Sequence, residues 1–421
     1  MALEKNTNIV MEKSNQALNY EIKKIDGVKL ATTCAGLKKK KRDDLLLIFF
    51  PKNSTVSAVF TKNKLAAAPV LIAKKNLLSK KKSCAIIVNS SIANAGTGKK
   101  GLEDVIFYTS YLAKKINCDA EQILPFSTGV IMEYLPIKKM VSGINCLVKE
   151  LSYTSWDNAS KAIMTTDTKN KVVKKRVIID GIELKIIGIA KGSGMIAPNM
   201  ATMLSFVFTN ALISKKLQNI IINDSVNKSF NNISVDGDTS TNDSYVLIST
   251  PSDKSLQIKN KDDKNFHIFR QLVIDISKKL ARKIVDDGEG ATKLLKLIIS
   301  GVENKKHCKI IASKICNSLL VKTALNASDP NIGRIYSALG SSELSFIQKD
   351  NFILQVNDLV IWNKGKIGAS YTEKKGKYEF KKKNIVIKVS FINKDSSPDT
   401  YEFYSCDLSK EYVEINSNYR T

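Results

Sequence analysis

The 421-residue sequence contains only two histidines, and this scarcity excludes several common kinds of site. His267 and His307 cannot supply a multi-histidine zinc centre, and a Ser-His-Asp or Cys-His enzyme would have to use one of them. Both lie in lysine-rich polar segments (KNFHIF and KKHCKI), so we expect them at the surface. A catalytic site in this chain is therefore expected to use other residue types.

Cysteine pairs and long apolar runs are also missing. The seven cysteines are scattered without a Cys-x-x-Cys spacing, which favours reduced thiols over a disulfide framework or a zinc ribbon, and we expect no metal site. The longest apolar run, Leu45 to Phe50, is far shorter than the ~20 residues that span a bilayer. The N-terminus lacks the apolar core of a secretory signal. These absences predict a soluble cytoplasmic protein with no membrane partner.

Arginine is scarce as well, although the formal net charge is +26. Only six of the 66 basic residues are arginine, whereas specific phosphate and base contacts favour the planar guanidinium group. The lysines form short clusters along the whole chain, at 38–41, 80–82 and 381–383, and none alternates with aromatic residues that could stack on bases. We expect no nucleic-acid partner.

The apolar fraction of 43% and the charged fraction of 25% are typical of a folded protein. Hydrophobic patterns predict the following elements: strands at 45–50, 56–60, 68–73 and 85–91, a helix at 103–116, a hairpin at 176–190 that turns at Asp180-Gly181, a strand from Met203, helices at 215–230 and 269–285, and short strands through the C-terminal third. Because strands and helices do not alternate strictly, the fold class is predicted to be α+β.

The most informative segment is Lys191 to Phe206, KGSGMIAPNMATMLSF. A phosphate-binding loop is excluded because the lysine precedes both glycines. One interpretation is an ordinary Gly/Pro turn between strands. The other is self-cleavage: Thr202 could attack the Ala201 carbonyl, and an N→O acyl shift followed by ester hydrolysis would cut the chain. The new α-amino group titrates near pH ~8 and can act as the base, so no histidine is needed.

Ordered motifs along the chain separate these interpretations. They are AGLKKKKRDDLLLI (35–48), VFTKNKLAAAPV (59–70), STGVI (127–131), MTTDTKNK (164–171), KGSGMIAPNMATML (191–204), SVDGDTSTND (234–243), DDGEGATK (286–293), DPNIGR (329–334) and INSNYRT (415–421). In this order they resemble the ornithine acetyltransferase / glutamate N-acetyltransferase family of arginine biosynthesis. Its members are self-cleaving enzymes with an N-terminal threonine, and the resemblance runs essentially end to end.

The resemblance implies roles for individual residues. Thr202 is the nucleophile for self-cleavage at Ala201–Thr202 and for the acetyl-enzyme, and Thr128 with Gly129 forms the oxyanion hole. The implied substrate-binding residues are Thr165, Lys191, Thr202, Glu289, Asn416 and Thr421. Lys191 suits a substrate carboxylate and Glu289 a substrate ammonium group. Thr165 is preferred to its neighbour Thr166 because its 26-residue spacing to Lys191 suits the family pattern.

The chain departs from the family pattern at several positions. Ala197 stands where the family has His, Met132 where it has Gly, Ile332 where it has Trp, and NSSIAN (89–94) replaces a glycine-containing segment. Met132 follows the oxyanion residues closely, and a side chain there is costly if the backbone needs a positive φ. The acyl-transfer residues are all present, so we expect activity to be retained.

The resemblance also implies an overall organisation. We expect a four-layer αββα sandwich with a smaller C-terminal α/β lobe at about 285–400, cut into an α-chain (1–201) and a β-chain (202–421) that assemble as α2β2. The reaction is ping-pong acetyl transfer from N2-acetylornithine to glutamate, with no cofactor and with acetyl-CoA as a candidate second donor. Two alternatives remain: a related self-processing aminopeptidase or amidohydrolase, and a degenerate non-catalytic basic binding protein.

Overall fold

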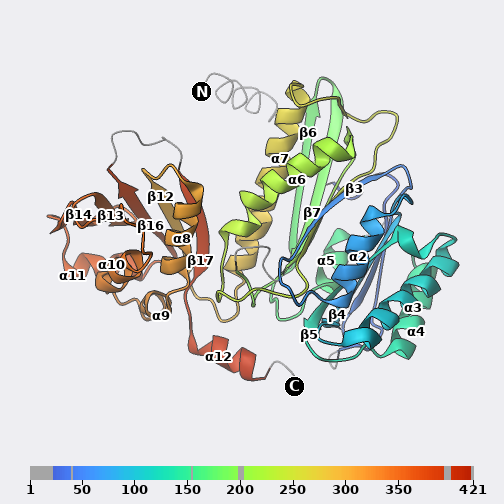
Figure 1. Cartoon of the computed structure of the whole chain (residues 1–421), viewed down its shortest axis with the longest axis horizontal. Coiled ribbons are helices and arrows are strands. Elements are labelled where there is room, and N and C mark those ends of the chain that lie inside the picture. Colours follow the sequence, from blue (N-terminus) through green and yellow to red (C-terminus); the bar gives the residue numbers. More distant parts are fainter. Residues whose placement is uncertain (1–21, 39–40, 153–154, 198–202, 393–399, 419–421) are drawn as a thin grey trace. The chain divides into compact units, whose positions relative to one another are not determined.

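The computed structural model describes residues 22–38, 41–152, 155–197, 203–392 and 400–418. The chain divides into two compact units (Figure 1). The first unit comprises the described residues within 1–192, 199–230 and 239–281. The second comprises those within 193–198, 231–238 and 282–421.

The first unit contains two main sheets. One has four strands in the spatial order β1 (Lys29–Thr33), β2 (Leu45–Phe49), β4 (Ala85–Ile92) and β5 (Ile123–Val130). The other has five, in the order β3 (Thr55–Phe60), β10 (Ser244–Ser249), β8 (Leu204–Thr209), β7 (Ile182–Lys191) and β6 (Lys171–Ile179). The pairs β4–β5 and β8–β10 are parallel and the other neighbours are antiparallel. A short pair, β9 (Leu212–Ile213) and β11 (Gln257–Ile258), completes the strands of this unit.

The two main sheets pack face to face. Leu46 and Ile48 of β2 belong to the same buried cluster as Phe206 and Phe208 of β8. Successive residues of a strand point to opposite faces, so the neighbouring side chains of β2 reach the other side of the sheet, where Leu47 joins a cluster with helices. The four-stranded sheet is therefore buried on both faces, which explains the nearly continuous apolar sequence of its strands.

Helices cover the outer faces of both sheets (Figure 1). Contacts place α2 (Ala68–Leu78), α3 (Gly98–Ile116) and α4 (Ile137–Lys149) with the four-stranded sheet, and α6 (Lys215–Asn227) with β3 and β10. Helix α7 (Lys264–Asp286) lies on the same side, because the Tyr245 hydroxyl of β10 is within hydrogen-bond distance of Ser225 in α6 and Ser277 in α7. This order of layers is the αββα sandwich that the family resemblance implied. Helix α5 (Trp156–Ala162) packs Trp156 into the inter-sheet cluster, and two short 3-10 turns occur at Ala120–Gln122 and Phe230–Asn232.

The second unit has its own sheet and its own core. Its six strands lie in the order β15 (Lys366–Ile367), β14 (Leu359–Asn363), β13 (Phe352–Val356), β16 (Asn384–Phe391), β12 (Leu294–Ser300) and β17 (Tyr401–Cys406). Its helices are α8 (Lys305–Cys316), α9 (Leu319–Ala327), α10 (Ile332–Gly340), α11 (Glu373–Phe380) and α12 (Lys410–Ser417). One apolar cluster joins this sheet to α8, α9 and α10, so the unit is an α/β lobe with an independent core.

The structure confirms the α+β class and most of the predicted elements, including the hairpin, where Asp180 and Gly181 both have positive φ. The strand predicted at 68–73 is wrong, since these residues begin helix α2. Pro69 stands in the first turn of that helix, where a missing N–H costs nothing. The C-terminal third contains helices α8 to α12 besides the predicted strands.

Other expectations concern single residue types. All seven cysteines are free thiols. His267 is exposed as expected, whereas His307 is half-buried. Within the part of the chain that the structure describes, no helix is long and apolar enough to cross a membrane.

Candidate active site

Three residues that the sequence singled out meet at one point of the first unit. Lys191 ends strand β7, and its side chain is almost completely buried. Its ammonium donates hydrogen bonds to Thr165 Oγ1 at 2.7 Å and to Thr128 Oγ1 at 3.2 Å. Thr128 comes from β5 of the other sheet, and Thr165 follows α5. Two threonines from separate segments thus contact one buried cation, the Lys191 ammonium.

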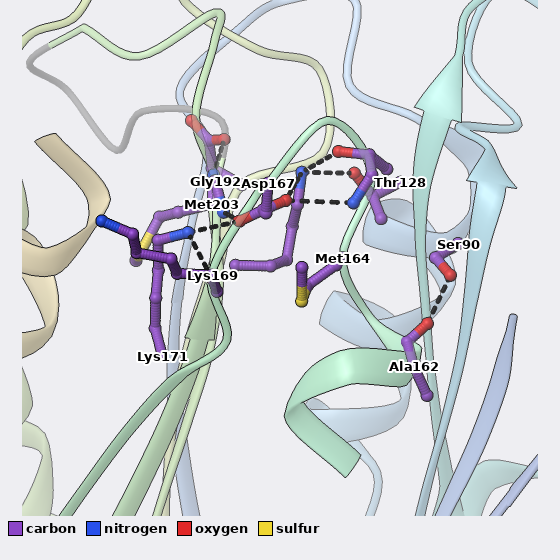
Figure 2. Close-up of polar contacts among 12 residues, drawn as sticks. Ser90, Thr128, Ala162, Met164, Asp167, Lys169, Lys171, Gly192 and Met203 are labelled. Atoms are coloured by element: carbon purple, nitrogen blue, oxygen red, sulfur yellow. Dashed lines mark hydrogen bonds and ion pairs between the residues drawn. The ribbon is translucent and has the colours of Figure 1, made fainter. Parts of the chain in front are cut away.

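Asp167, which the sequence reasoning did not single out, lies in the middle of this cluster (Figure 2). Its carboxylate accepts from Lys171 Nζ at 2.7 Å and from the backbone N–H groups of Gly192 at 2.7 Å and Thr165 at 3.0 Å. Lys191 Nζ lies 4.0 Å away. Burial alone would raise the pKa of Asp167, but the two ammonium groups and the Gly192 N–H outweigh it and hold that pKa well below its usual value. Asp167 therefore stays ionised and fixes both lysines.

Two further cations lie on the loop before β2. Lys38 Nζ donates to the Met164 carbonyl at 2.7 Å, and Arg42 donates to the Thr165 carbonyl at 2.6 Å. These bonds hold the segment that carries Thr165. Burial, together with the neighbouring Arg42 charge, lowers the pKa of Lys38 to about 7. Both residues belong to the 35–48 motif, which sequence reasoning quoted without giving either residue a role.

Gly129 follows Thr128 on an edge strand. Among the described strands, β5 lies at the end of its sheet and pairs with β4 alone, so alternate backbone groups of β5 point away from the sheet. The Val130 carbonyl accepts from the Ala93 N–H, on the side of β5 that faces β4. The backbone groups of successive strand residues point to opposite sides, so the peptide N–H of Gly129 points toward the open edge of the sheet. Gly129 has a φ of +131°, and a Cβ there would collide with the backbone of Ser91. Glycine is therefore the residue that this N–H donor position can accommodate.

The backbone just after the proposed cleavage point is held by two hydrogen bonds. Ala201 and Thr202 lie outside the described residues, and Met203 is the first described residue after them. The Met203 N–H donates to Asp243 Oδ1 at 2.9 Å, and the Ser244 N–H donates to the Met203 carbonyl at 3.0 Å. The first residue of β10 and the residue before it thus hold the backbone of Met203, the residue after position 202.

Glu289 and Asn416 meet in the second unit. Asn416 Nδ2 donates to Glu289 Oε2 at 2.8 Å, which brings together two predicted substrate-binding residues 127 positions apart. The Glu289 N–H donates to the Ser193 carbonyl at 2.9 Å, and a Cβ on Gly194 would overlap the Glu289 carboxylate. The Gly-rich segment after Lys191 therefore packs directly on this carboxylate. Thr421 lies outside the described residues.

The departures from the family pattern have different surroundings. Met132 has a φ of +63° while its side chain is 74% exposed, so its backbone does occupy the left-handed region. Ala197 is buried, and Ile332 packs against the core of the second unit as the first residue of α10. Among these departures, Met132 and Asn94, the last residue of NSSIAN, both have a left-handed backbone, with Asn94 at a φ of +50°.

Candidate metal ligands are not clustered. Among the described residues, no group of three or more His, Cys, Asp or Glu side chains could hold a metal ion. The absence of a cofactor and the use of acetyl-CoA stay predictions.

Comparisons with known proteins give a consistent result. Residues 29–421 match the model of the ArgJ family. The chain is 40% identical over 342 residues to the arginine biosynthesis bifunctional protein ArgJ of Colwellia psychrerythraea, covering 80% of each chain. It is also 40% identical over 337 residues to the protein of the same name from Pseudomonas fluorescens, covering 80% of this chain and 82% of the other. The crystal structure of the Bacillus halodurans ArgJ protein is 37% identical, with a TM-score of 0.39, and covers 42% of this chain and 92% of that one.

Proposed function

Because this chain belongs to the ArgJ family, we propose that it moves the acetyl group of N2-acetylornithine to glutamate through an acetyl-threonine at Thr202. The resemblance seen in the motifs is confirmed, and with it the assignment as an acyltransferase enzyme of arginine biosynthesis. The finer steps below are part of the proposal. The observation that carries them is the convergence of Lys191, Thr128 and Thr165.

The first step is self-cleavage. Thr202 Oγ attacks the Ala201 carbonyl carbon, and the proton of Oγ passes to the Thr202 nitrogen as the C–N bond breaks. The resulting ester is hydrolysed, which leaves a carboxylate on Ala201 and a free α-amino group on Thr202. That amine titrates near pH ~8, so at neutral pH a useful fraction can accept the Thr202 hydroxyl proton.

The second step is acetyl transfer. Thr202 Oγ attacks the acetyl carbonyl of N2-acetylornithine, ornithine leaves, and the acetyl-enzyme passes its acetyl group to the amine of glutamate. Both transfers develop negative charge on the carbonyl oxygen. The Gly129 N–H at the open edge of β5 and the Thr128 hydroxyl are suited to stabilise it. Removing one such donor typically costs about 10²–10³ in rate.

Substrate recognition is proposed to use charge. The buried ammonium of Lys191, which Thr165 and Thr128 hold in place, suits a substrate carboxylate. Thr165 Oγ1 accepts from Lys191 and can donate to the same substrate group. Glu289 is assigned to a substrate ammonium group, with Asn416 orienting its carboxylate and the terminal Thr421 completing the set.

The remaining parts of the proposal are the assembly and the donors. We assign an α2β2 arrangement of the two cleaved chains and a cytoplasmic location. The curated relatives are named bifunctional, which makes acetyl-CoA the second donor to assay. Light scattering of the purified protein tests the assembly.

The decisive experiment is intact mass with N-terminal sequencing, followed by an acetyl-transfer assay. We expect two chains, the second beginning Thr-Met-Leu-Ser, and N-acetylglutamate formed from acetylornithine and glutamate. Thr202→Ala should give one uncut chain without transfer. Cleavage in that variant, or acetylornithine hydrolysis at the same rate without glutamate as with it, would contradict the proposal; the second result would indicate an amidohydrolase.

A further inference from the structure

Asn242 joins two points of the four-stranded sheet although it belongs to the chain entering the other sheet. Its Nδ2 donates to the Ala93 carbonyl at 2.7 Å and to the Ser127 carbonyl at 2.9 Å. Its Oδ1 accepts from the Thr241 hydroxyl at 2.6 Å. Both amide hydrogens and the amide oxygen are thus used, and the side chain is only 4% exposed. The orientation of this amide is therefore fixed.

Asp243, the next residue, makes the complementary contact to the five-stranded sheet. Its Oδ1 accepts from the Met203 N–H at 2.9 Å, and its own carbonyl accepts from Thr61 N at 2.9 Å. The side chain is completely buried, and its Oδ2 has no hydrogen-bonding partner among the described residues. These two adjacent residues therefore make contacts to both sides: Asn242 with β5, and Asp243 with the residue before β8.

The groups that Asn242 and Asp243 hold are direct neighbours of the proposed catalytic residues. Ser127 precedes Thr128 in β5, and its carbonyl lies on the same open edge as the Gly129 N–H. Met203 follows Thr202 directly in the chain. The Asn242–Asp243 peptide bond and two side-chain hydrogen bonds therefore connect β5, which carries the oxyanion donors, to Met203, the residue after the nucleophile.

We propose that Asn242 and Asp243 are positioning residues that set the distance between the oxyanion donors of β5 and the nucleophile before β8. This inference rests on the proposed acetyl-threonine mechanism and adds to it two residues that touch no substrate. The physical need is clear, because the donors lie on β5 of one sheet and the strand that follows the nucleophile in the chain, β8, belongs to the other sheet. A displacement of about 1 Å can cost about 100-fold in rate. Acyl transfer needs both donors within hydrogen-bond distance of the developing oxyanion.

Asp243 acts here as the acceptor of a backbone N–H. Burial raises the pKa of Asp243 well above its usual value, because the charged form of the carboxyl group is cut off from solvent. An asparagine at this position keeps an acceptor for the Met203 N–H and has the same size. Asp243→Asn should therefore behave like the parent protein, whereas Asp243→Ala should not.

Asn76 offers a matched control for Asn242. It lies in α2 and is 6% exposed, and its Nδ2 also donates to two backbone carbonyls, those of Ala120 at 3.3 Å and Ile123 at 2.8 Å. Ile123 begins β5, at the opposite end of the strand from Thr128. Asn76→Ala and Asn242→Ala thus remove the same kind of contact from the same strand, but only the second removes it beside the donors.

The experiment compares self-cleavage rate, thermal unfolding and the kinetics of acetyl transfer for the parent protein, Asn242→Ala and Asn76→Ala. We expect Asn242→Ala to slow cleavage and to lower kcat by about 10–100-fold while KM for acetylornithine changes by less than about twofold. Asn76→Ala should lower the unfolding temperature similarly and leave kcat within about twofold. Equal kcat losses in both variants would overturn the inference, since the effect would then be one of general stability.

Two further arms keep the inference falsifiable if Asn242→Ala folds poorly. Asp243→Asn should retain cleavage, kcat and its pH profile, and Asp243→Ala should lose both rates. A large kcat loss or a shifted pH profile in Asp243→Asn would overturn the positioning role of Asp243. In addition, the double variant Asn242→Ala/Thr128→Ala should lose less kcat than the product of the two single-variant losses, because both substitutions act through one donor. Losses of kcat that multiply fully would count against the inference.

These outcomes are separable from failure of the proposed function. If the parent protein neither cleaves nor transfers acetyl groups, the acetyl-threonine mechanism fails, and the inference falls with it. If the parent protein does both and the Asn242 and Asp243 variants match their controls, the inference alone is wrong.

Discussion

Lys191 Nζ lies 3.2 Å from Thr128 Oγ1, and in this contact the ammonium group is the donor. The Thr128 oxygen therefore accepts, and its hydroxyl hydrogen remains to be donated elsewhere. A developing oxyanion is a suitable acceptor for that hydrogen. The contact thus connects a buried positive charge to the proposed oxyanion hole through one hydroxyl group.

This relationship predicts that the hydroxyl of Thr128 matters more than its shape. Thr128→Val, which keeps the size of the side chain, should reduce self-cleavage and acetyl transfer by about 10²–10³-fold because one donor is lost. Thr128→Ser should retain most of both activities. The measurements are the cleavage rate by mass spectrometry and kcat for acetylornithine. A Val variant as active as the Ser variant would remove the hydroxyl from the mechanism.

Glu289 is predicted to serve the substrate rather than processing. Glu289→Gln keeps an amide oxygen that can accept from Asn416 but removes the negative charge that pairs with an ammonium group. We expect normal cleavage and a kcat/KM lower by about 10–100-fold, which corresponds to losing a hydrogen bond to a charged group. Asn416→Ala, which leaves the charge in place, should have the smaller effect. An uncut Glu289→Gln chain would instead assign the residue to processing or folding.

The elements that could be predicted from the sequence are those determined by local pattern. The 176–190 hairpin follows from two β-branched runs and the Asp180-Gly181 turn, and it is confirmed. The segment 68–73 was mistaken for a strand because a short apolar run has no period that separates a strand from a buried helix. Pro69, which can open a helix, was the signal that favoured the helix.

The site residues also divide into those that a local motif indicates and those that depend on contacts between distant segments. Thr128, Thr165 and Lys191 could be named from motifs, and the structure brings them together. The roles of Asp167 and Asn242 could not be assigned, because they depend on contacts between distant segments. Asn242 and Ser127, for instance, are 115 positions apart and meet only when the two sheets pack. No local property of an asparagine in SVDGDTSTND indicates which carbonyl it will bind.

Lys38 is predicted to make stability depend on pH. Burial lowers the pKa of Lys38 to about 7 in the folded protein, whereas an unfolded lysine titrates near 10.4. Between these values the unfolded chain binds a proton that the folded chain lacks, so the contribution of Lys38 to the free energy of unfolding increases as pH rises from about 7 toward about 10. Replacing Lys38 with methionine should remove this contribution.

Urea unfolding at pH 7, 8.5 and 10 would check this expectation. The unfolding free energy of the parent protein minus that of Lys38→Met isolates the lysine from other titrating groups, and this quantity should increase as pH rises. Lys139 provides the control, since it is an exposed lysine that also donates to a backbone carbonyl, that of Gly36 at 2.6 Å. A pH-independent difference for Lys38→Met, equal to that for Lys139→Met, would contradict the argument.

Met132 is predicted to be a site where a smaller residue stabilises the fold. Its φ of +63° places an L side chain in the left-handed region, which costs roughly 1–2 kcal/mol, and its exposed side chain gains little from packing. Met132→Gly removes that cost but adds about 0.5–1 kcal/mol of unfolded-state entropy. The net gain is about 0.5–1 kcal/mol, so thermal unfolding should occur about 1–3 °C higher. Met132→Ala retains a Cβ and with it the strain, so it should show no such gain; an Ala variant as stable as the Gly variant would assign the effect to the lost side chain instead of the backbone.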